Sequence, residues 1–425
     1  MTASLVRSMG AAARLRAVAL CLGLISAGFP VLAKAVEIPL TFEFRPSALH
    51  PQLNTFVNTT PNEGLCREYD KACDSLQSVL LRMELTYSAF EVDADERHQA
   101  FFKIPNQFQE IQLRHVDTDD VAIASWRATL LAGKYVLPVN IRDIVGDDID
   151  DSLAGHRRLW GGKGWVIPGD GGCETTGWAQ LDSFYYAWGW KFPTAATGCS
   201  KKTQYPFASM RMHDLSVAYA MRTPTPLAMK NGIYTGKIQF NVGPGQAFDF
   251  GDNVTATDSE VTFVITLTVA HEFQVTFPSA APRVTLAPIG GWQQWTDHGT
   301  PPRRLQQELP FTLTSSSDFS VKMRCEHESG GRCGIEDLAA GTVVPVDVDV
   351  TLPGVSEVNT GVRAVEFPLV TQQVATAPRF RPDSFTVNRP SKLRFSANGN
   401  AVAEMLKAPG SRWQGDVTII FDSDP

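Results

Sequence analysis

The chain has 425 residues, of which 43% are hydrophobic and 20% are charged. Its formal net charge is −7 at pH 7. Because nucleic-acid-binding proteins present basic surfaces to phosphates, this acidic balance argues against a nucleic-acid partner.

Residues 1–35 are typical of a secretory signal peptide. Basic residues come first, an apolar run follows, and the small residues Ala33 and Ala35 are those a signal peptidase reads. We therefore expect a mature chain that begins at Val36, has 425 − 35 = 390 residues, and carries a net charge of −7 − 4 = −11 once four basic residues are removed. Because no later run reaches the roughly 18 apolar residues of a membrane span, we expect an exported soluble protein. An uncleaved anchor is the alternative.

Alternating apolar residues predict many short strands and few helices. The clearest strand signals are residues 36–44, 261–277, 319–325, 346–352 and 417–421. Residues 66–79 and 401–408 are the best helix candidates. Many short strands separated by Gly and Pro turns predict an all-β protein built from β-sandwiches.

Six cysteines lie outside the expected signal peptide: Cys66, Cys73, Cys173, Cys199, Cys325 and Cys333. An even number in an exported chain predicts disulfides. The spacing suggests three local pairs, 66 with 73, 173 with 199 and 325 with 333, although other connectivities stay open. No CxxC motif or neighbouring histidine pair is present, so a zinc site is not expected.

Five aromatic side chains share one face of a predicted strand, namely Phe184, Tyr186, Trp188, Trp190 and Phe192. Such a face can stack on sugar rings as an exposed platform, which makes Trp188 and Trp190 candidate receptor contacts. The alternative is that it packs in the sandwich core, as large aromatic residues usually do, and this interpretation is favoured. Gly189 between the two tryptophans indicates a bulge or a close approach of another segment.

Residues 261–277 alternate without interruption over a length that exceeds the usual ~5–6 residues of a strand. We interpret this run as the last strand of one domain passing directly into the first strand of the next, with a boundary near 268–270. No Gly/Ser or Pro linker intervenes, which predicts a short and stiff junction. The expected domains are residues 36–268 and 269–425.

The sequence closes on another alternating strand, in which Val417, Ile419 and Phe421 share one face. An apolar strand of this kind is expected to have neighbours in a sheet. Either earlier strands of this chain supply them, or a neighbour comes from another molecule.

The second half resembles the pilin domain of the CblD/CfaE-like class 5 fimbrial tip adhesins, which initiate pilus biogenesis. The resemblance is carried by GGWQQW, FTLTSSSDFSVKMRC, GTVVPVDVDVTLPG and AVAEMLKAPGSRWQGDVTIIFDS. It covers about residues 270–425 and extends more loosely over 36–269. It implies two tandem immunoglobulin-like sandwiches, a receptor-binding adhesin domain (36–268) and a pilin domain (269–425) that lacks its final strand.

The resemblance also implies partners and a location. A periplasmic pilus chaperone fills the groove beside Val417, Ile419 and Phe421, and at the outer-membrane usher a donor strand of the major pilin subunit replaces it. The protein would be secreted through the periplasm to the fimbrial tip at the cell surface, where it mediates adhesion and virulence. Residues 36–44 are interpreted as the first strand of the adhesin domain, so this subunit would accept a strand and donate none.

Adhesins of this family are expected to bind host glycans or glycoproteins through basic surfaces. The candidate cations are Arg157, Arg158, Lys201, Lys202 and Arg222, and any of them can instead be ordinary solvated surface charge. Arg222 is predicted to face outward because Leu215, Val217, Tyr219 and Met221 take the inward positions. Arginine forks suit the carboxylates of acidic sugars.

Catalytic signatures are weak, so no enzymatic activity and no cofactor are expected. The histidines are dispersed, and neither a HExxH zinc motif nor a GxSxG elbow is present. The acidic stretch 147–151 is dense enough in carboxylates for calcium but lacks a regular loop spacing, so no metal site is assigned. The alternatives to a tip adhesin are a structural pilus initiator that binds no receptor and, less favoured, a secreted carbohydrate-active protein.

Overall fold

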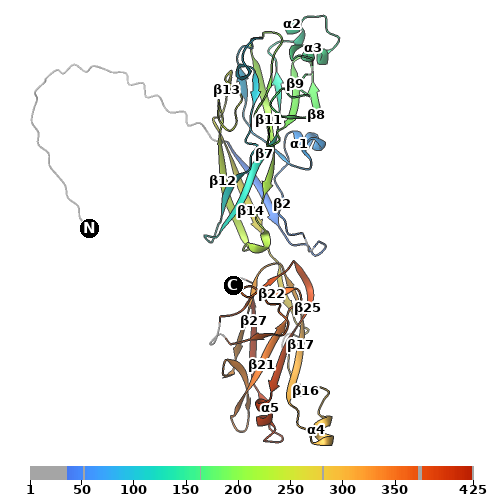
Figure 1. Cartoon of the computed structure of the whole chain (residues 1–425), viewed down its shortest axis with the longest axis vertical. Coiled ribbons are helices and arrows are strands. Elements are labelled where there is room, and N and C mark those ends of the chain that lie inside the picture. Colours follow the sequence, from blue (N-terminus) through green and yellow to red (C-terminus); the bar gives the residue numbers. More distant parts are fainter. Residues whose placement is uncertain (1–35, 51–52, 163, 280–281, 372–375, 424–425) are drawn as a thin grey trace, which may run out of the picture. The chain divides into compact units, whose positions relative to one another are not determined.

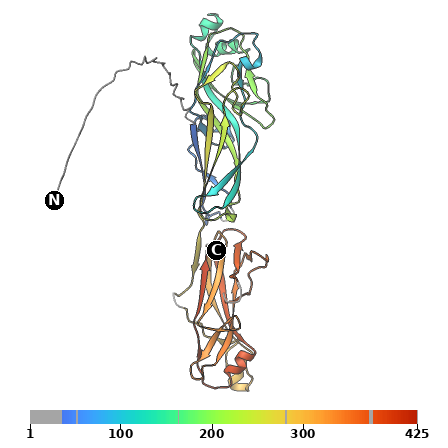
Figure 2. The same ribbon diagram turned by 90° about the vertical axis from the view of Figure 1, so that its left-hand side faces the viewer.

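The computed structural model describes residues 36–50, 53–162, 164–279, 282–371 and 376–423. The expected signal peptide, residues 1–35, lies outside this described part of the chain. The prediction of an all-β protein is confirmed, because strands dominate and the helices are short (Figures 1 and 2). In the described ranges, every helix is too short or too polar to cross a membrane.

The first half, residues 36–269, consists of strands that pair only with one another among the described residues. Its strands are β1 (Val36–Phe44), β2 (Val57–Asn58), β3 (Ser78–Leu80), β4 (Leu85–Tyr87), β5 (Ala100–Phe102), β6 (Gln109–His115), β7 (Val121–Val136), β8 (Glu174–Leu181), β9 (Tyr185–Lys191), β10 (Cys199–Lys201), β11 (Met210–Arg222), β12 (Gly232–Asn241), β13 (Val254–Ala256) and β14 (Glu260–Val269). The main sheet runs β13-β4-β11-β7-β6-β12-β14-β1-β2, with β9 also pairing with β7 and β8. Strands β5 and β10 form a separate pair.

The two ends of the first half lie side by side in this sheet. β1 pairs in parallel with β14 over its whole length, from Val36 opposite Val261 to Phe44 opposite Val269. The predicted inward residues of both strands are buried: Ile38, Leu40, Phe42, Phe44, Val261, Phe263, Ile265, Leu267 and Val269. Period-two alternation therefore correctly predicted which faces of these strands form the core.

The predicted helix over residues 66–79 is wrong. The structure has a short helix α1 (Leu65–Glu68), a 3-10 turn (Asp70–Cys73), and the strand β3. Asp74 and Ser75 take positive φ angles of 50° and 66°, which an α-helix cannot continue. The predicted helix over 401–408 is confirmed as α5 (Asn400–Met405), which ends earlier than expected.

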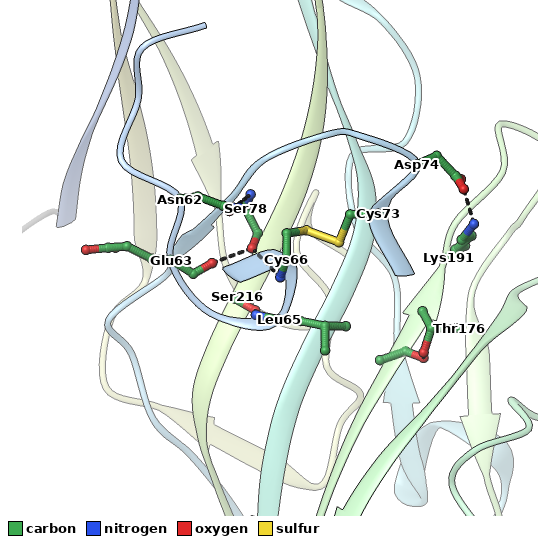
Figure 3. The surroundings of a disulfide bond; sticks show 11 residues. Asn62, Glu63, Leu65, Cys66, Cys73, Asp74, Ser78, Thr176, Lys191 and Ser216 are labelled. Carbon is green, nitrogen blue, oxygen red and sulfur yellow. Dashed lines mark hydrogen bonds and ion pairs between the residues drawn. A yellow bond between two sulfur atoms is a disulfide. The ribbon is translucent and has the colours of Figure 1, made fainter. Parts of the chain in front are cut away.

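The three predicted local disulfides are confirmed: Cys66–Cys73, Cys173–Cys199 and Cys325–Cys333. Figure 3 shows the first of them, where Cys66 donates its N–H to the Ser78 hydroxyl and Ser78 in turn donates to the Glu63 carbonyl. Lys191 on β9 forms an ion pair with Asp74 at 2.6 Å. The disulfide therefore closes the loop 63–78 on itself, and the ion pair between Asp74 and Lys191 holds it against the main sheet.

Other helical segments of the first half are short. They are α2 (Ile141–Val145), α3 (Ser152–Leu159) and 3-10 turns at Glu96–His98 and Pro226–Ala228. Both α2 and α3 begin at side-chain caps, because Asn140 accepts from Arg142 N and Asp151 accepts from Ala154 N.

The second half begins with β15, which three residues separate from the end of β14, and it forms two facing sheets. Its strands are β15 (Phe273–Thr276), β16 (Ala287–Pro288), β17 (Arg304–Ser315), β18 (Phe319–Cys325), β19 (His327–Ser329), β20 (Arg332–Asp337), β21 (Val343–Thr351), β22 (Val355–Glu357), β23 (Phe367–Leu369), β24 (Arg379–Pro382), β25 (Thr386–Asn398), β26 (Trp413–Gln414) and β27 (Val417–Asp422), with α4 (Gln293–His298) and α5 at loops. One sheet runs β15-β17-β25-β21-β20-β19, and the other runs β22-β24-β18-β27. This is a β-sandwich (Figures 1 and 2).

Candidate functional site

The strand β27 has one neighbour, β18, among the residues that the structure describes. The two strands pair antiparallel, with Val321 opposite Phe421, Met323 opposite Ile419 and Cys325 opposite Val417. Figure 1 labels β27 beside the C-terminus. In an antiparallel pair only every second residue bonds to the partner, so half of the backbone groups of β27 point away from β18.

Burial drops sharply between β18 and β27. Val321 and Met323 are each 1% exposed, whereas Phe421 and Ile419, directly opposite them on the same face, are only partly buried. Opposite residues in one pair should be covered equally if the sandwich continued past both strands. Within the part of the chain that the structure describes, the outer side of β27 therefore lacks the cover that β18 has.

The first strand of the second half shows the same loss of cover. Phe273 and Val275 of β15 are partly buried, although Leu313, which lies opposite Val275 on β17, is fully buried. Phe277, just after β15, is also partly buried. β15 pairs only with β17 in the described part of the chain, so it is the end strand of its sheet.

The two end strands lie on the same side of the sandwich. Ring centroids of Phe421 and Phe277 are 6.5 Å apart, and Phe421 lies 5.4 Å from Phe311 of β17. Through these contacts β27 of one sheet meets β17 and the residues just after β15 of the other sheet, so both end strands lie at the same edge of the sandwich. We call this region the open edge and define it by Phe273, Val275, Phe277, Val417, Ile419 and Phe421.

The opposite face of β27 carries Thr418, Ile420 and Asp422, two of which are polar. Lys322 of β18 forms an ion pair with Asp422 at 2.5 Å, diagonally across the strand pair. This pair lies on the face of the sheet away from the core. Val417, Ile419 and Phe421 pack against the core cluster and take the inward positions that the alternation predicted.

The predicted basic residues come from three different elements. Arg157 and Arg158 lie on α3, Lys201 and Lys202 lie in and just after β10, and Arg222 ends β11. Arg157, Lys202 and Arg222 are exposed. Lys201 is only 5% exposed, so it is not a surface cation.

Arg158 has an internal partner. Its guanidinium lies 2.5 Å from an Asp148 carboxylate oxygen and also donates to the Val145 and Asp148 carbonyls. The hydrogen bond from Arg158 lowers the pKa of Asp148. Since Asp151 caps α3, two carboxylates of the acidic stretch 147–151 have roles in holding this loop.

The platform interpretation of Trp188 and Trp190 is contradicted. Both are 0% exposed, and they pack against Trp165 with ring centroids 5.1 and 5.4 Å away. Trp190 also donates its indole N–H to the Trp165 carbonyl at 2.7 Å. The favoured alternative, a core face, is the one observed.

Two other residues of this segment, Phe184 and Gly189, also bear on the predictions made for it. Phe184 does not share the buried face, because it precedes β9 and is 47% exposed. The predicted close approach at Gly189 is confirmed, since a Cβ there would lie 2.3 Å from the Leu65 side chain. The loop that carries Cys66 and Leu65 therefore packs directly on β9.

The sequence did not single out Phe108 and Arg127, which the fold places beside Arg222. The Arg222 guanidinium carbon lies 3.8 Å from the centroid of the Phe108 ring, and that of Arg127 lies 5.3 Å from it. The available signal was weak: Arg127 occupies an outward position on a long strand that also carries Ser125, Thr129 and Lys134.

No protein-family model matches the chain, and no curated protein matches it. Among solved structures, it is similar to a mutant of CfaE, the CFA/I adhesin of enterotoxigenic E. coli, with 8% identity and a TM-score of 0.26, covering 92% of this chain and 95% of that chain. It is also similar to the CsuC–CsuE chaperone–tip adhesion subunit pre-assembly complex from archaic chaperone–usher Csu pili of Acinetobacter baumannii, with 9% identity and a TM-score of 0.20, covering 91% and 98%. At these identities and TM-scores the similarities are no argument for a function, which has to be inferred from the site itself.

Proposed function

We propose that this protein is a tip subunit of a chaperone–usher pilus. Its second half, residues 269–425, accepts a donor strand at the open edge, first from a periplasmic chaperone and then from the major pilin at the outer-membrane usher. Its first half, residues 36–268, is the adhesin domain that contacts a host glycan or glycoprotein. The protein reaches the cell surface through the periplasm and has a binding role without catalysis.

The observation that carries this proposal is the incomplete burial of the open edge. Inward side chains on the two end strands are partly exposed, while their direct neighbours on β17 and β18 are buried. A further strand laid along β27 would cover them and satisfy its unpaired backbone groups. No described segment of this chain occupies that position.

The expected energies are large enough for assembly. Each apolar side chain of a donor that becomes fully buried would contribute roughly 1.5–3 kcal/mol. Each additional ladder hydrogen bond would contribute about 0.5–1.5 kcal/mol. Four or five inserted residues would thus rival the ~5–15 kcal/mol that usually stabilises a whole domain.

The position at the tip is supported by β1. This strand pairs with β14 and β2 inside its own half, and its side chains Ile38, Leu40, Phe42 and Phe44 are buried in the core. β1 is therefore not available as a donor for a neighbouring subunit. A subunit that accepts a strand through β27 and keeps β1 for itself would end a fibre.

The test is to supply the missing strand. A strand of about ten residues with alternating Val and Thr, joined after Pro425 by a flexible linker, should raise the unfolding temperature of the second half by more than about 5 °C. The matched control carries Ser at every Val position, so it can form the same ladder but cannot fill the core. Equal unfolding temperatures for the Val fusion, the Ser fusion and the unfused chain would rule the proposal out.

A further inference from the structure

The segment between β16 and β17 exposes large apolar side chains around the helix α4. Ile289 is 73% exposed, Trp292 is 42% exposed and Trp295 is 36% exposed. α4 buries none of its own residues, and Gly299 ends it with a positive φ of 65°, as is common at the end of a helix. Because monomeric surfaces seldom group large apolar side chains, such a group is typical of a surface that binds another molecule.

The second half closes its core without these side chains. Figure 1 shows α4 and α5 at the same end of the sandwich. α5 closes this end, because Ala401 and Val402 are buried in one cluster with residues of β17 and β21. Ile289, Trp292 and Trp295 belong to no core cluster of the described residues. Their replacement should therefore leave the stability of the second half nearly unchanged.

A pocket of about 250 Å³ lies between α4 and the residues that precede β17. Its walls combine apolar and planar polar side chains, among them Ile289, Gln294, Trp295, Pro301, Pro302 and Arg303. Anchor side chains of a protein partner commonly insert into pockets of this kind. Arg303 is exposed and has no ion pair among the described residues, so it can receive a carboxylate of that partner. We call Ile289, Trp292, Trp295 and Arg303 the α4 site.

The α4 site lies at the end of the sandwich opposite to its junction with the first half. β17 reaches both ends, because it begins at Arg304, directly after the α4 site, and pairs through residues 312–315 with β15 at the junction. Its 12 residues span roughly 40 Å at about 3.3 Å per residue. β16 pairs with the same side of β17 as β15 does, so this edge of the sheet leads from the open edge to the α4 site.

Only the end beside α4 has room for a further folded domain. The first half is joined to the other end through residues 270–272, and the chain from Val269 to Phe273 spans roughly 14 Å even when fully extended. A subunit that lays a donor strand along the open edge has to keep its own folded body at one end of that strand. Because the first half occupies the space at the junction, that body lies beside α4.

We propose that the α4 site binds the folded body of the major pilin subunit whose donor strand fills the open edge. An apolar side chain of that subunit inserts into the pocket beside Trp295, and a carboxylate pairs with Arg303. Two linked contacts with one partner hold it more tightly than the strand alone, because binding at one raises the effective concentration at the other. This inference rests on the proposed function and adds a second contact with the same partner.

Binding of two probes to the full-length chain separates the strand from the body. One probe is a synthetic peptide with the N-terminal donor segment of the major pilin. The other is the whole pilin, whose own groove is filled by a second, fused copy of that segment so that it cannot polymerise. We expect Trp295→Ala to weaken binding of the whole pilin about tenfold or more and to leave binding of the peptide unchanged.

Two further variants sharpen the test. Val365→Ala, which shortens another exposed side chain of the second half outside the pocket, should bind both probes as the wild type does. Arg303→Glu should weaken binding of the whole pilin, and more so at low than at high ionic strength, because the contact joins exposed charges. Neither Trp295→Ala nor Arg303→Glu should lower the unfolding temperature, since both residues lie outside the core.

The inference is overturned if Trp295→Ala binds the whole pilin as the wild type does, or if it loses the peptide and the pilin to the same extent. Sedimentation of the chain alone tests a second copy as the occupant, and a dimer that Trp295→Ala dissociates would also overturn it. A chain that binds the peptide but holds the whole pilin no more tightly keeps the proposed pilus role and loses only the α4 contact. A chain that binds neither probe loses both.

Discussion

His156 is buried at the centre of a chain of hydrogen bonds in the first half. Its Nε2 lies 2.8 Å from the Asp182 carbonyl, and its Nδ1 lies 2.7 Å from the Tyr135 hydroxyl. A carbonyl only accepts, so Nε2 carries the proton and Nδ1 accepts from Tyr135, which itself accepts from the Trp160 indole at 3.0 Å. Burial lowers the pKa of His156 below its ordinary value of 6.5, outweighing the opposite effect of Asp182. The ring is therefore neutral in the folded state.

This arrangement predicts a loss of stability in acid. Between the ordinary pKa of 6.5 in the unfolded chain and the lower pKa in the folded chain, the unfolded state binds the proton more readily, so the free energy of unfolding falls as the pH drops through this range. The slope due to this group is at most about 1.4 kcal/mol per pH unit. Urea denaturation at pH 7.5 and 5.5 should show a smaller drop for His156→Gln than for the wild type. An identical drop in both proteins would contradict the assignment.

Single residues also show where sequence reasoning succeeds. Arg222 was predicted to face outward from the parity of its strand, and it is exposed. Its neighbours Phe108 and Arg127 were not predicted, because they are separated from it by about a hundred residues of sequence and meet only through the order of β6, β7 and β11. Parity specifies the face of a residue, whereas the order of strands decides which residues share that face.

At the scale of elements, the disulfides differ in how much chain they enclose. Cys173–Cys199 spans 26 residues that include β8 and β9, whereas Cys66–Cys73 spans 7. In the chain-entropy description, the longer loop stabilises by about 3–4 kcal/mol and the shorter one by about 2–3 kcal/mol. Replacing each pair by serines should therefore cost more at Cys173–Cys199. Urea denaturation followed by tryptophan fluorescence measures both, and a larger loss at Cys66–Cys73 would contradict this order.

The alternating strands could be predicted from the sequence, whereas the compact loop at 66–79 could not. Val346, Val348 and Val350 alternate with aspartates in the sequence and are buried in β21, as are the inward residues of β1 and β14. The segment 66–79 has helical periodicity, but the local disulfide and two positive φ angles turn it into a compact loop. A disulfide bond and left-handed backbone angles depend on the folded structure, so neither can be recognised from the spacing of apolar residues.

At the scale of the whole molecule, the inward side of β27 was predictable and its lack of cover was not. Alternation placed Val417, Ile419 and Phe421 inward, but only the sheet order shows that β27 has β18 as its described neighbour. The same alternation would describe a central strand such as β21, which pairs with β25 on one side and with β20 and β23 on the other. The resemblance to pilin domains supplied the expectation of an open edge, and the burial contrast supports it.

Amide hydrogen exchange of the full-length chain, resolved along residues 417–422, tests the open edge most directly. We expect about every second amide of β27 to exchange rapidly, because it points away from β18, while β21 stays protected throughout as the internal reference. Fusion of the alternating Val strand should then protect the exchanging amides of β27. Protection of all β27 amides at the level of β21 in the unfused chain would show that this strand already has two neighbours, and no donor would be required.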